Sequence, residues 1–374
     1  MNYHVDPRSP IPAYMQLYKL IVQDIISEVY PYGSRLPSKR TIAEETGISV
    51  ITVEHAIELL SEEGYIETRQ RSGCFVIYRK SDFHETPVLE SSTLSKIKPQ
   101  SNSVGDFPFS VFAKTMRKVL ASYGNRIFIK SPNSGCDELR REICLYLARS
   151  RGISVKPSQI IVGSGAEYLY GLIAQLFRNR NKFVLELPSY DKIRKVYEAM
   201  GIQCDMLSLT QDGISSKELE RTDATILHVT PFNSFPSGVT ASISKKHEYL
   251  RWANQRDGFI IEDNYDSELT VSKKPEDSLF SITSDSNVVY VNTFSKTIAP
   301  SVRIGYMLLP EKLLEDFQCR LGFYSCTVPV FEQLVLAELL RNGDFERHIN
   351  RVRRKKRKAL NDIGNDGLNT VKST

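Results

Sequence analysis

Residues 287–306 read Asn-Val-Val-Tyr-Val-Asn-Thr-Phe-Ser-Lys-Thr-Ile-Ala-Pro-Ser-Val-Arg-Ile-Gly-Tyr, which places one lysine between two strand-like runs. A lysine that forms a Schiff base needs a lowered pKa and a fixed position. Hydroxyl groups and an arginine close to it suit an anionic phosphate. The stretch therefore predicts Lys296 as a Schiff-base lysine, with Thr293, Ser295 and Arg303 at a phosphate. A plain strand–turn–strand segment is the alternative.

A second segment, residues 258–266, is an apolar run that ends in acidic residues and a tyrosine. Pyridoxal phosphate needs an acid facing its ring nitrogen, because a protonated pyridinium is the better electron sink. Asp263 and Tyr265 are two positions apart, so a strand would point both side chains to one face. We therefore expect Asp263 at the ring nitrogen and Tyr265 as a donor to the phenolic oxygen.

The N-terminal part has the pattern of a winged helix-turn-helix. Periodicity and capping residues predict helices over 12–30, 39–46 and 50–63, and strands over 65–69 and 74–78. Ser38 and Ser49 are the predicted caps of the second and third helices. A winged helix used only for protein contacts is the alternative.

In such a motif the N-terminal residues of the recognition helix enter the major groove. We expect base contacts from Ser49, Thr52 and His55. The other predicted DNA-contacting residues, most of them at phosphates, are Ser38, Lys39, Arg40, Arg69, Arg71 and Gly73. Residues 1–80 hold nine Lys/Arg against ten Asp/Glu. Local clusters of basic residues are therefore better evidence for DNA binding than the net charge of this part.

Residues 79–105 are rich in Ser and Pro, which predicts a linker. From Asp106 onward strands and helices alternate, which predicts an α/β domain with a mainly parallel sheet and helices on both faces. Ligands bind at the carboxyl ends of such strands. Predicted strand runs are each followed by one member of the set Ser164, Tyr190, Asn233, Asp263 and Lys296. This shared placement predicts a single site.

The turn at residues 163–167 opens a predicted helix, whose N-terminus would offer backbone N–H groups to a phosphate. Together with residues 35–40 and 63–66, these segments resemble the MocR (GabR-like) subfamily of GntR-type bacterial regulators, in which a winged helix is fused to a fold-type I aminotransferase-like domain. The resemblance covers about residues 10–360. It implies a winged helix at 1–78, a linker at 79–105 and a pyridoxal-phosphate-binding effector domain at 106–374.

The resemblance also implies roles for particular residues. Ser164, Gly165 and Ala166 would hold the cofactor phosphate, Tyr190 would stack on its ring, and Asn233 would bond its phenolic oxygen. It further implies a head-to-tail homodimer, an operator with two half-sites, and an amino compound or the vitamer itself as effector.

Four departures from the family pattern stand out. Relatives carry arginine and a polar residue at Val50 and Ile51, glutamine at Glu167, and His-Gln at residues 233–234. The family also continues into a small domain with a substrate-binding arginine, for which we expect no room after residue 360. A basic run at 351–358 is interpreted as a solvated helix face rather than a nucleic-acid patch.

Composition narrows the function classes. No apolar run has the length of a membrane helix, the N-terminus has no signal-peptide pattern, and the six cysteines show no metal-site spacing; a cytoplasmic protein is expected. The net charge of +5 is weak evidence for a nucleic-acid partner. The rival readings are a working aminotransferase that also binds DNA, which would release keto acid, and a dimerisation scaffold without cofactor, which would be colourless.

Overall fold

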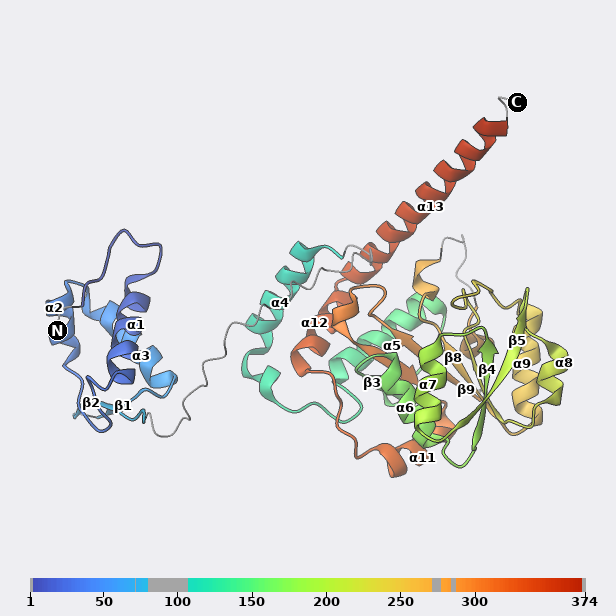
Figure 1. The fold of residues 1–374 in the computed structure, drawn as a ribbon, viewed down its shortest axis with the longest axis horizontal. Coiled ribbons are helices and arrows are strands. Elements are labelled where there is room, and N and C mark those ends of the chain that lie inside the picture. Colours follow the sequence, from blue (N-terminus) through green and yellow to red (C-terminus); the bar gives the residue numbers. More distant parts are fainter. Residues whose placement is uncertain (1–2, 71, 80–106, 271–276, 284–286, 372–374) are drawn as a thin grey trace. The chain divides into compact units, whose positions relative to one another are not determined.

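The computed structural model describes residues 3–70, 72–79, 107–270, 277–283 and 287–371, with side chains up to residue 359. The chain divides into two compact units, Met1–Pro99 and Gln100–Thr374 (Figure 1). Nearly all of the predicted linker lies outside the described residues, and the predicted domain boundaries stay predictions. No helix among the described residues is long and apolar enough to cross a membrane.

The first unit is a winged helix, as predicted. It contains α1 (Ala13–Ile26), α2 (Lys39–Thr46), α3 (Val50–Glu62) and the antiparallel hairpin of β1 (Ile66–Arg69) and β2 (Gly73–Val76). Ser38 and Ser49 cap α2 and α3 through hydrogen bonds from the backbone of Thr41 and Thr52, which confirms both predicted caps.

The first helix is shorter than predicted. The prediction extended it to residue 30, but α1 ends at Ile26 and Val29 is 61% exposed. Glu28 has a φ of 61°, and this left-handed conformation turns the chain out of the helix. The core of the unit is apolar, with Leu17 and Ile21 of α1 and Leu60 of α3 almost fully buried.

The second unit is built on an eight-stranded sheet with the order β3-β10-β9-β8-β7-β4-β5-β6. Its strands are β3 (Ile160–Gly163), β4 (Lys182–Leu187), β5 (Gln203–Thr210), β6 (Gly213–Ile214), β7 (Ile226–Val229), β8 (Phe259–Asp263), β9 (Val288–Thr293) and β10 (Gly305–Leu308). β10 and β6 run antiparallel to their neighbours, while β5, β4, β7, β8 and β9 are mutually parallel. The predicted mainly parallel sheet is confirmed.

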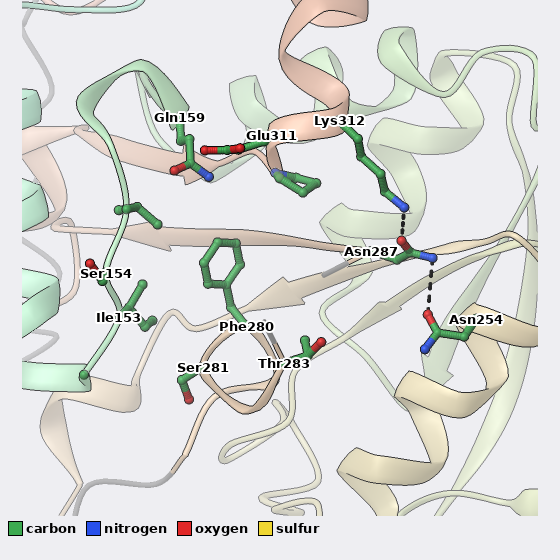
Figure 2. A pocket seen from close by; sticks show the side chains of 13 residues that line it. Ile153, Ser154, Gln159, Asn254, Phe280, Ser281, Thr283, Asn287, Glu311 and Lys312 are labelled. Carbon is green, nitrogen blue, oxygen red and sulfur yellow. Dashed lines mark hydrogen bonds between the residues drawn. The ribbon is translucent and has the colours of Figure 1, made fainter. Parts of the chain in front are cut away.

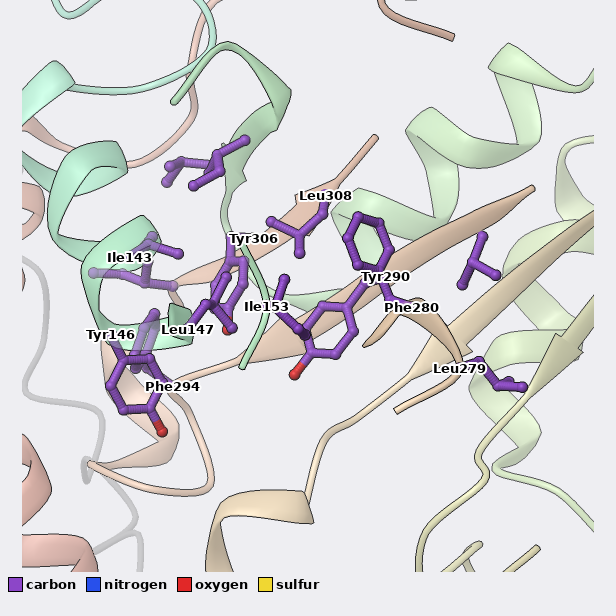
Figure 3. Packing of buried hydrophobic residues seen from close by; sticks show 14 of the residues in the cluster. Ile143, Tyr146, Leu147, Ile153, Leu279, Phe280, Tyr290, Phe294, Tyr306 and Leu308 are labelled. Carbon is purple, nitrogen blue, oxygen red and sulfur yellow. The ribbon is translucent and has the colours of Figure 1, made fainter. Parts of the chain in front are cut away.

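Side chains alternate along the strands between two apolar layers. Tyr290 and Tyr306 face one layer, with α5 and α12 (Figure 3), whereas Val291 and Met307 face the other, with α6, α7 and α11. This period of two is that of a strand buried on both faces. The helices are α4 (Phe109–Tyr123), α5 (Asp137–Arg151), α6 (Ala166–Leu176), α7 (Asp191–Ala199), α8 (Ser216–Arg221), α9 (Ile243–Gln255), α10 (Leu279–Ile282), α11 (Glu311–Leu321), α12 (Val330–Arg341) and α13 (Asp344–Val371). Short 3-10 turns are η2 (Gly124–Phe128), η3 (Pro157–Gln159), η4 (Ser267–Leu269) and η5 (Pro300–Val302).

The antiparallel strand β10 positions the site. Its first residue, Gly305, pairs with Gly163 at the end of β3 and with Thr293 at the end of β9. The start of β10 therefore lies at the same sheet edge as the carboxyl ends of its neighbours. Arg303, just before β10, is thereby brought to the turn that opens α6.

Candidate functional site

A cavity of about 310 Å³ lies at this carboxyl edge. Seven of the predicted cofactor residues line it: Ala166, Tyr190, Asp263, Tyr265, Thr293, Ser295 and Arg303. The other four predicted residues, Ser164, Gly165, Asn233 and Lys296, are outside its lining. Gly165 precedes Ala166 in the chain, while Asn233 and Lys296 contact Tyr265. The backbone N–H of Ser164 donates instead to Oγ1 of Thr327, which is not part of the lining. Residues from distant parts of the chain thus meet at one place.

Asp263 is a buried acid in the wall of the cavity. It ends β8 and is 4% exposed. Tyr170 on α6 donates a hydrogen bond to its Oδ2, and Nε2 of His228 lies 3.8 Å from the same oxygen. Its Oδ1 is buried and has no hydrogen-bond partner among the described residues. A buried acceptor without a donor is unfavourable, so this oxygen is suited to a donor on a bound ligand.

Tyr170 was missed by sequence reasoning, because an aromatic residue at a helical spacing usually means core packing. Burial, followed by the nearby Asp263 charge, raises the pKa of its hydroxyl well above the ordinary value, so the hydroxyl remains a donor. Behind it, the Tyr197 hydroxyl lies 2.8 Å from Nδ1 of His228. Asp263 is therefore held by a buried chain of polar groups.

Tyr265 lines the cavity, but it does not lie on the strand where the prediction placed it. The prediction placed it on the same strand face as Asp263, but β8 ends at Asp263 and Tyr265 lies in the following turn. Its hydroxyl donates to the backbone oxygen of Asn233 at 2.9 Å. Burial, then the charge of Asp266, raises the pKa of Tyr265.

Asp266 joins two predicted cofactor residues. Its Oδ1 lies 3.2 Å from Nζ of Lys296, and its Oδ2 accepts a hydrogen bond of 2.6 Å from Nδ2 of Asn233. Nζ of Lys296 also lies 4.4 Å from the ring centroid of Tyr265. Sequence reasoning missed Asp266, although a further acid after Tyr265 in the same segment was a visible signal. The side-chain amide of Asn233 is thus bonded to Asp266.

The cavity lining also contains the groups of an anion site. Gly165 precedes α6 with a φ of 98°, and a Cβ there would lie 3.0 Å from Nη2 of Arg303. Glycine is therefore required where the arginine approaches the helix N-terminus. Oγ1 of Thr293 donates to Oγ of Ser295 at 3.1 Å. These positive and polar groups surround one corner of the cavity.

Glu167 occupies the same corner. Nη2 of Arg303 lies 2.7 Å from one of its oxygens, and Nζ of Lys192 lies 3.2 Å from the other. Burial alone would raise the pKa of Glu167, but the hydrogen bonds from Arg303, the backbone and Lys192 hold it below its ordinary value. A carboxylate therefore already neutralises part of the positive charge at this anion site.

Tyr190 stands at the rim of the cavity. Its side chain is 37% exposed, and its ring meets that of Phe235 edge to face, with 6.3 Å between centroids. Two aromatic rings at the rim form an apolar wall. Phe235 was not among the predicted site residues.

Glu186 lies beside the cavity at the end of β4. It is 4% exposed and accepts hydrogen bonds from Oγ of Ser234 at 2.5 Å and from the backbone N–H of Thr230 at 3.2 Å. Burial raises its pKa to about 8, against the opposing effect of these two hydrogen bonds. Sequence reasoning missed this acid, because Glu186 lies inside an apolar run.

A larger cavity, of about 820 Å³, is lined by Ile153, Phe280, Asn287 and Lys312 among other residues (Figure 2). Its polar side chains bond one another: Lys312 donates to Asn287, which donates to Asn254 at 3.4 Å. None of the predicted site residues lines it. We therefore assign the candidate site to the smaller cavity.

The predicted DNA-contacting residues lie on and near α2, α3 and the hairpin. Ser49 and His55 are exposed on α3, and Thr52 is half-buried there. Ser38 and Arg40 are exposed, whereas Lys39 is paired with Glu54 of α3.

In the hairpin, Arg69 lies 3.2 Å from Glu67 and above the ring of Phe75. Gly73 has a φ of 108°, and a Cβ there would lie 2.8 Å from Nε of Arg35. Glycine is thus needed for this close approach. Arg71 lies outside the described residues.

Comparison with known proteins assigns both units. Residues 13–76 match the model for bacterial regulatory proteins of the gntR family, and residues 100–373 match aminotransferase class I and II. The chain is 36% identical to an uncharacterized HTH-type transcriptional regulator, YdeL of Bacillus subtilis, over 93% of this chain and 77% of that protein.

Two other relatives have more informative names. The chain is 27% identical to the HTH-type pyridoxine biosynthesis transcriptional regulator PdxR of Corynebacterium glutamicum, over 95% of this chain and 78% of that protein. It is 26% identical to the probable rhizopine catabolism regulatory protein MocR of Rhizobium meliloti, over 94% and 76%.

Solved structures agree on the fold of the second unit. A kynurenine aminotransferase of Pyrococcus horikoshii in complex with PMP is similar with a TM-score of 0.60, at 24% identity and over 66% of this chain. The α-aminoadipate aminotransferase LysN of Thermus thermophilus, complexed with N-(5'-phosphopyridoxyl)-L-leucine, is similar with a TM-score of 0.59, again at 24% identity and over 66% of this chain. The chain spans 64% of each of these aminotransferases.

Proposed function

The chain belongs to the MocR-like transcriptional regulators, which join a DNA-binding domain of the gntR family to an aminotransferase class I and II domain, and we propose that its second domain binds pyridoxal 5'-phosphate through Lys296 and senses the vitamer or an amino compound. The first domain would bind operator DNA. As a head-to-tail homodimer the protein would present two winged helices to two half-sites.

The unpartnered Oδ1 of Asp263 is the observation that carries this proposal. It is a buried acceptor in the wall of a cavity whose lining also includes Arg303, Thr293 and Ser295. A flat ligand that carries both a ring N–H and a phosphate would satisfy both kinds of group. Similar folds have been solved with PMP and with a phosphopyridoxyl compound, which supports the same ligand class.

Different residues would hold different parts of such a ligand. Asp263 would accept the hydrogen bond of the ring nitrogen, and Tyr190 would cover the ring at the rim. Arg303 and the N-terminus of α6 would bind the phosphate, and Lys296 would hold the aldehyde carbon covalently. When bound, the cofactor supplies an electron sink for chemistry at an amino group.

Lys296 and Tyr265 are positioned by their neighbours. Asp266 holds Nζ of Lys296 beside the Tyr265 ring, at the edge of the cavity. The Tyr265 hydroxyl, now bonded to the Asn233 backbone, would turn to a phenolic oxygen on the ligand. An effector would regulate DNA binding only if it favoured one arrangement of the protein over another.

The visible absorption spectrum of the purified protein with added pyridoxal phosphate tests the proposal. The wild type should show a band that borohydride removes, and Lys296→Ala should show none. Lys312→Ala, which removes a lysine bonded to Asn287 in the other cavity, should keep the band. A band of equal strength in Lys296→Ala, or none in the wild type, would refute the assignment.

A further inference from the structure

Two aliphatic side chains are exposed at the start of the recognition helix. Val50 is 44% exposed and Ile51 is 68% exposed, in the first turn of α3. On the same helix Val53 and Leu60 are fully buried in the domain core. Val50 and Ile51 are therefore not part of the buried domain core, and both leave apolar surface in water.

Their position is the part of a helix-turn-helix that enters the major groove. The positive groups around them suit DNA: Arg40 is exposed on α2, and Lys39 is paired with Glu54, one turn further along α3. The hydrogen bond from Lys39 lowers the pKa of Glu54, so this carboxylate faces a neighbouring cation. The acid that follows Val50 and Ile51 one turn along α3 is thus paired with a cation.

The nearby hydroxyl groups are already engaged. Oγ of Ser49 accepts the backbone N–H of Thr52 at 3.1 Å, and the two hydroxyls lie 2.8 Å apart. They hold the first turn of α3 together. The two aliphatic side chains are the exposed ones of this turn that take no part in its capping hydrogen bonds.

Valine and isoleucine have no hydrogen-bonding groups, so they cannot pair with the donors and acceptors of guanine, adenine or cytosine. The apolar group on a base edge in the major groove is the C5-methyl of thymine. We propose that Val50 and Ile51 contact thymine methyl groups, so that each operator half-site presents T·A pairs to the first turn of α3. The inference rests on DNA binding by the winged helix and is independent of the cofactor.

The test uses full-length protein and DNA duplexes selected by it from a random pool. Each selected duplex is then remade with deoxyuridine in place of individual thymidines, which removes the methyl group and keeps every base-pairing group. At one or two positions in each half-site the affinity should fall about threefold to tenfold, as expected for loss of a buried methyl contact. At other positions it should not change.

The variant Val50→Ala/Ile51→Ala should discriminate less than the wild type between thymidine and deoxyuridine duplexes, because only the Cβ methyl of each side chain remains for such a contact. Alanine has the higher helix propensity, and both replaced side chains are exposed, so the fold should be retained; circular dichroism checks this. Val29→Ala is the matched control, since it removes a 61% exposed valine of the same domain and should keep the preference for thymidine.

Three results would overturn the inference. The first is equal affinity of the wild type for thymidine and deoxyuridine duplexes at every position. The second is an unchanged preference for thymidine in the folded double variant. The third is the absence of any enriched sequence, which would mean that the first turn of α3 reads no base. A missing cofactor band would leave all three measurements unaffected.

Discussion

The winged helix buries no charged side chain among its described residues 3–70 and 72–79, whereas the aminotransferase-like domain buries Glu186, Asp263 and Asp266 around its cavity. A DNA ligand lies outside the protein, so its contacts can stay in water. A small ligand is enclosed, so its contacts are removed from water and must be held by other polar groups. Changes at the DNA surface should therefore affect binding alone, while changes at the cavity should affect binding and stability together.

The pH dependence of stability is the largest expected difference. Burial raises the pKa of Glu186 from 4.5 to about 8, so the folded domain keeps a proton that the unfolded chain releases. This stabilisation is complete below pH 4.5 and is lost progressively as the pH rises from 4.5 through 8, on the order of 5 kcal/mol in total. Urea unfolding followed by the fluorescence of Trp252, the single tryptophan, reports on this domain.

Glu186→Gln should remove this dependence between pH 5 and 9, because glutamine keeps the shape of the side chain and does not ionise. Identical pH profiles of the wild type and the variant would show that Glu186 does not titrate in this range. They would also mean that this buried acid beside the cavity does not control the stability of the second domain.

Tyr170→Phe should destabilise the second domain by about 1.5–3 kcal/mol, since it removes a hydrogen bond to a buried charged acceptor, Asp263. Tyr197→Phe is the control, because it removes a hydroxyl that faces His228 instead, and it should cost about 1 kcal/mol. Trp252 fluorescence in urea gives both values. Equal decreases in the free energy of unfolding would mean that the hydrogen bond to Asp263 contributes no more than the one that faces His228.

Glu167→Gln should raise the affinity for pyridoxal phosphate about tenfold, or roughly 1.4 kcal/mol, because it frees Arg303 from an internal carboxylate. Affinity for unphosphorylated pyridoxal should not change. Titration of the absorption band measures both.

The control for Glu167 is Glu138→Gln. Both acids lie in the first turn of a helix, 2.7 Å from an arginine nitrogen, with side chains 27% exposed, but Glu138 is remote from the cavity lining. Glu138→Gln should leave the affinities for pyridoxal phosphate and for pyridoxal unchanged. Weaker binding of pyridoxal phosphate by Glu167→Gln would instead mean that Glu167 orients Arg303.

Arg40→Ala should have the smallest effect on stability, within about 0.5 kcal/mol, because the side chain is exposed. DNA binding should weaken similarly for all sequences, and the salt dependence of the affinity should fall by about one unit of slope. Fluorescence anisotropy at several salt concentrations measures this. A change confined to one sequence would mean that Arg40 contacts a base.

The sequence was most informative where local pattern decides structure. The caps at Ser38 and Ser49 and the elements of the winged helix were predicted because each depends on residues close together in the chain. The mainly parallel sheet was predicted because strands and helices alternate along the chain. The strand β5 was missed because its sequence, Gln-Cys-Asp-Met-Leu-Ser-Leu-Thr, contains no long apolar run. The early end of α1 was missed because it depends on the backbone of Glu28.

For the candidate site, residue types were easier to predict than partners. Seven of the predicted cofactor residues share one cavity, but the groups that hold them did not show in the sequence. Tyr170 meets Asp263 from 93 positions away, and Arg303 meets Glu167 across the sheet edge. Such pairs depend on the strand order, and the antiparallel direction of β10 cannot be predicted from an apolar run.

The two ends of the connection from β9 to β10 are held together by backbone pairing. Thr293 and Gly305 are paired in the sheet, and the backbone N–H of Phe294 donates to the oxygen of Ile304 at 2.8 Å. Lys296 and Arg303 are both carried between these fixed points. An inserted or deleted residue would therefore shift both side chains at once, with no slack to absorb it. Across related proteins the length of this segment should therefore stay constant, even where residues between Lys296 and Arg303 differ.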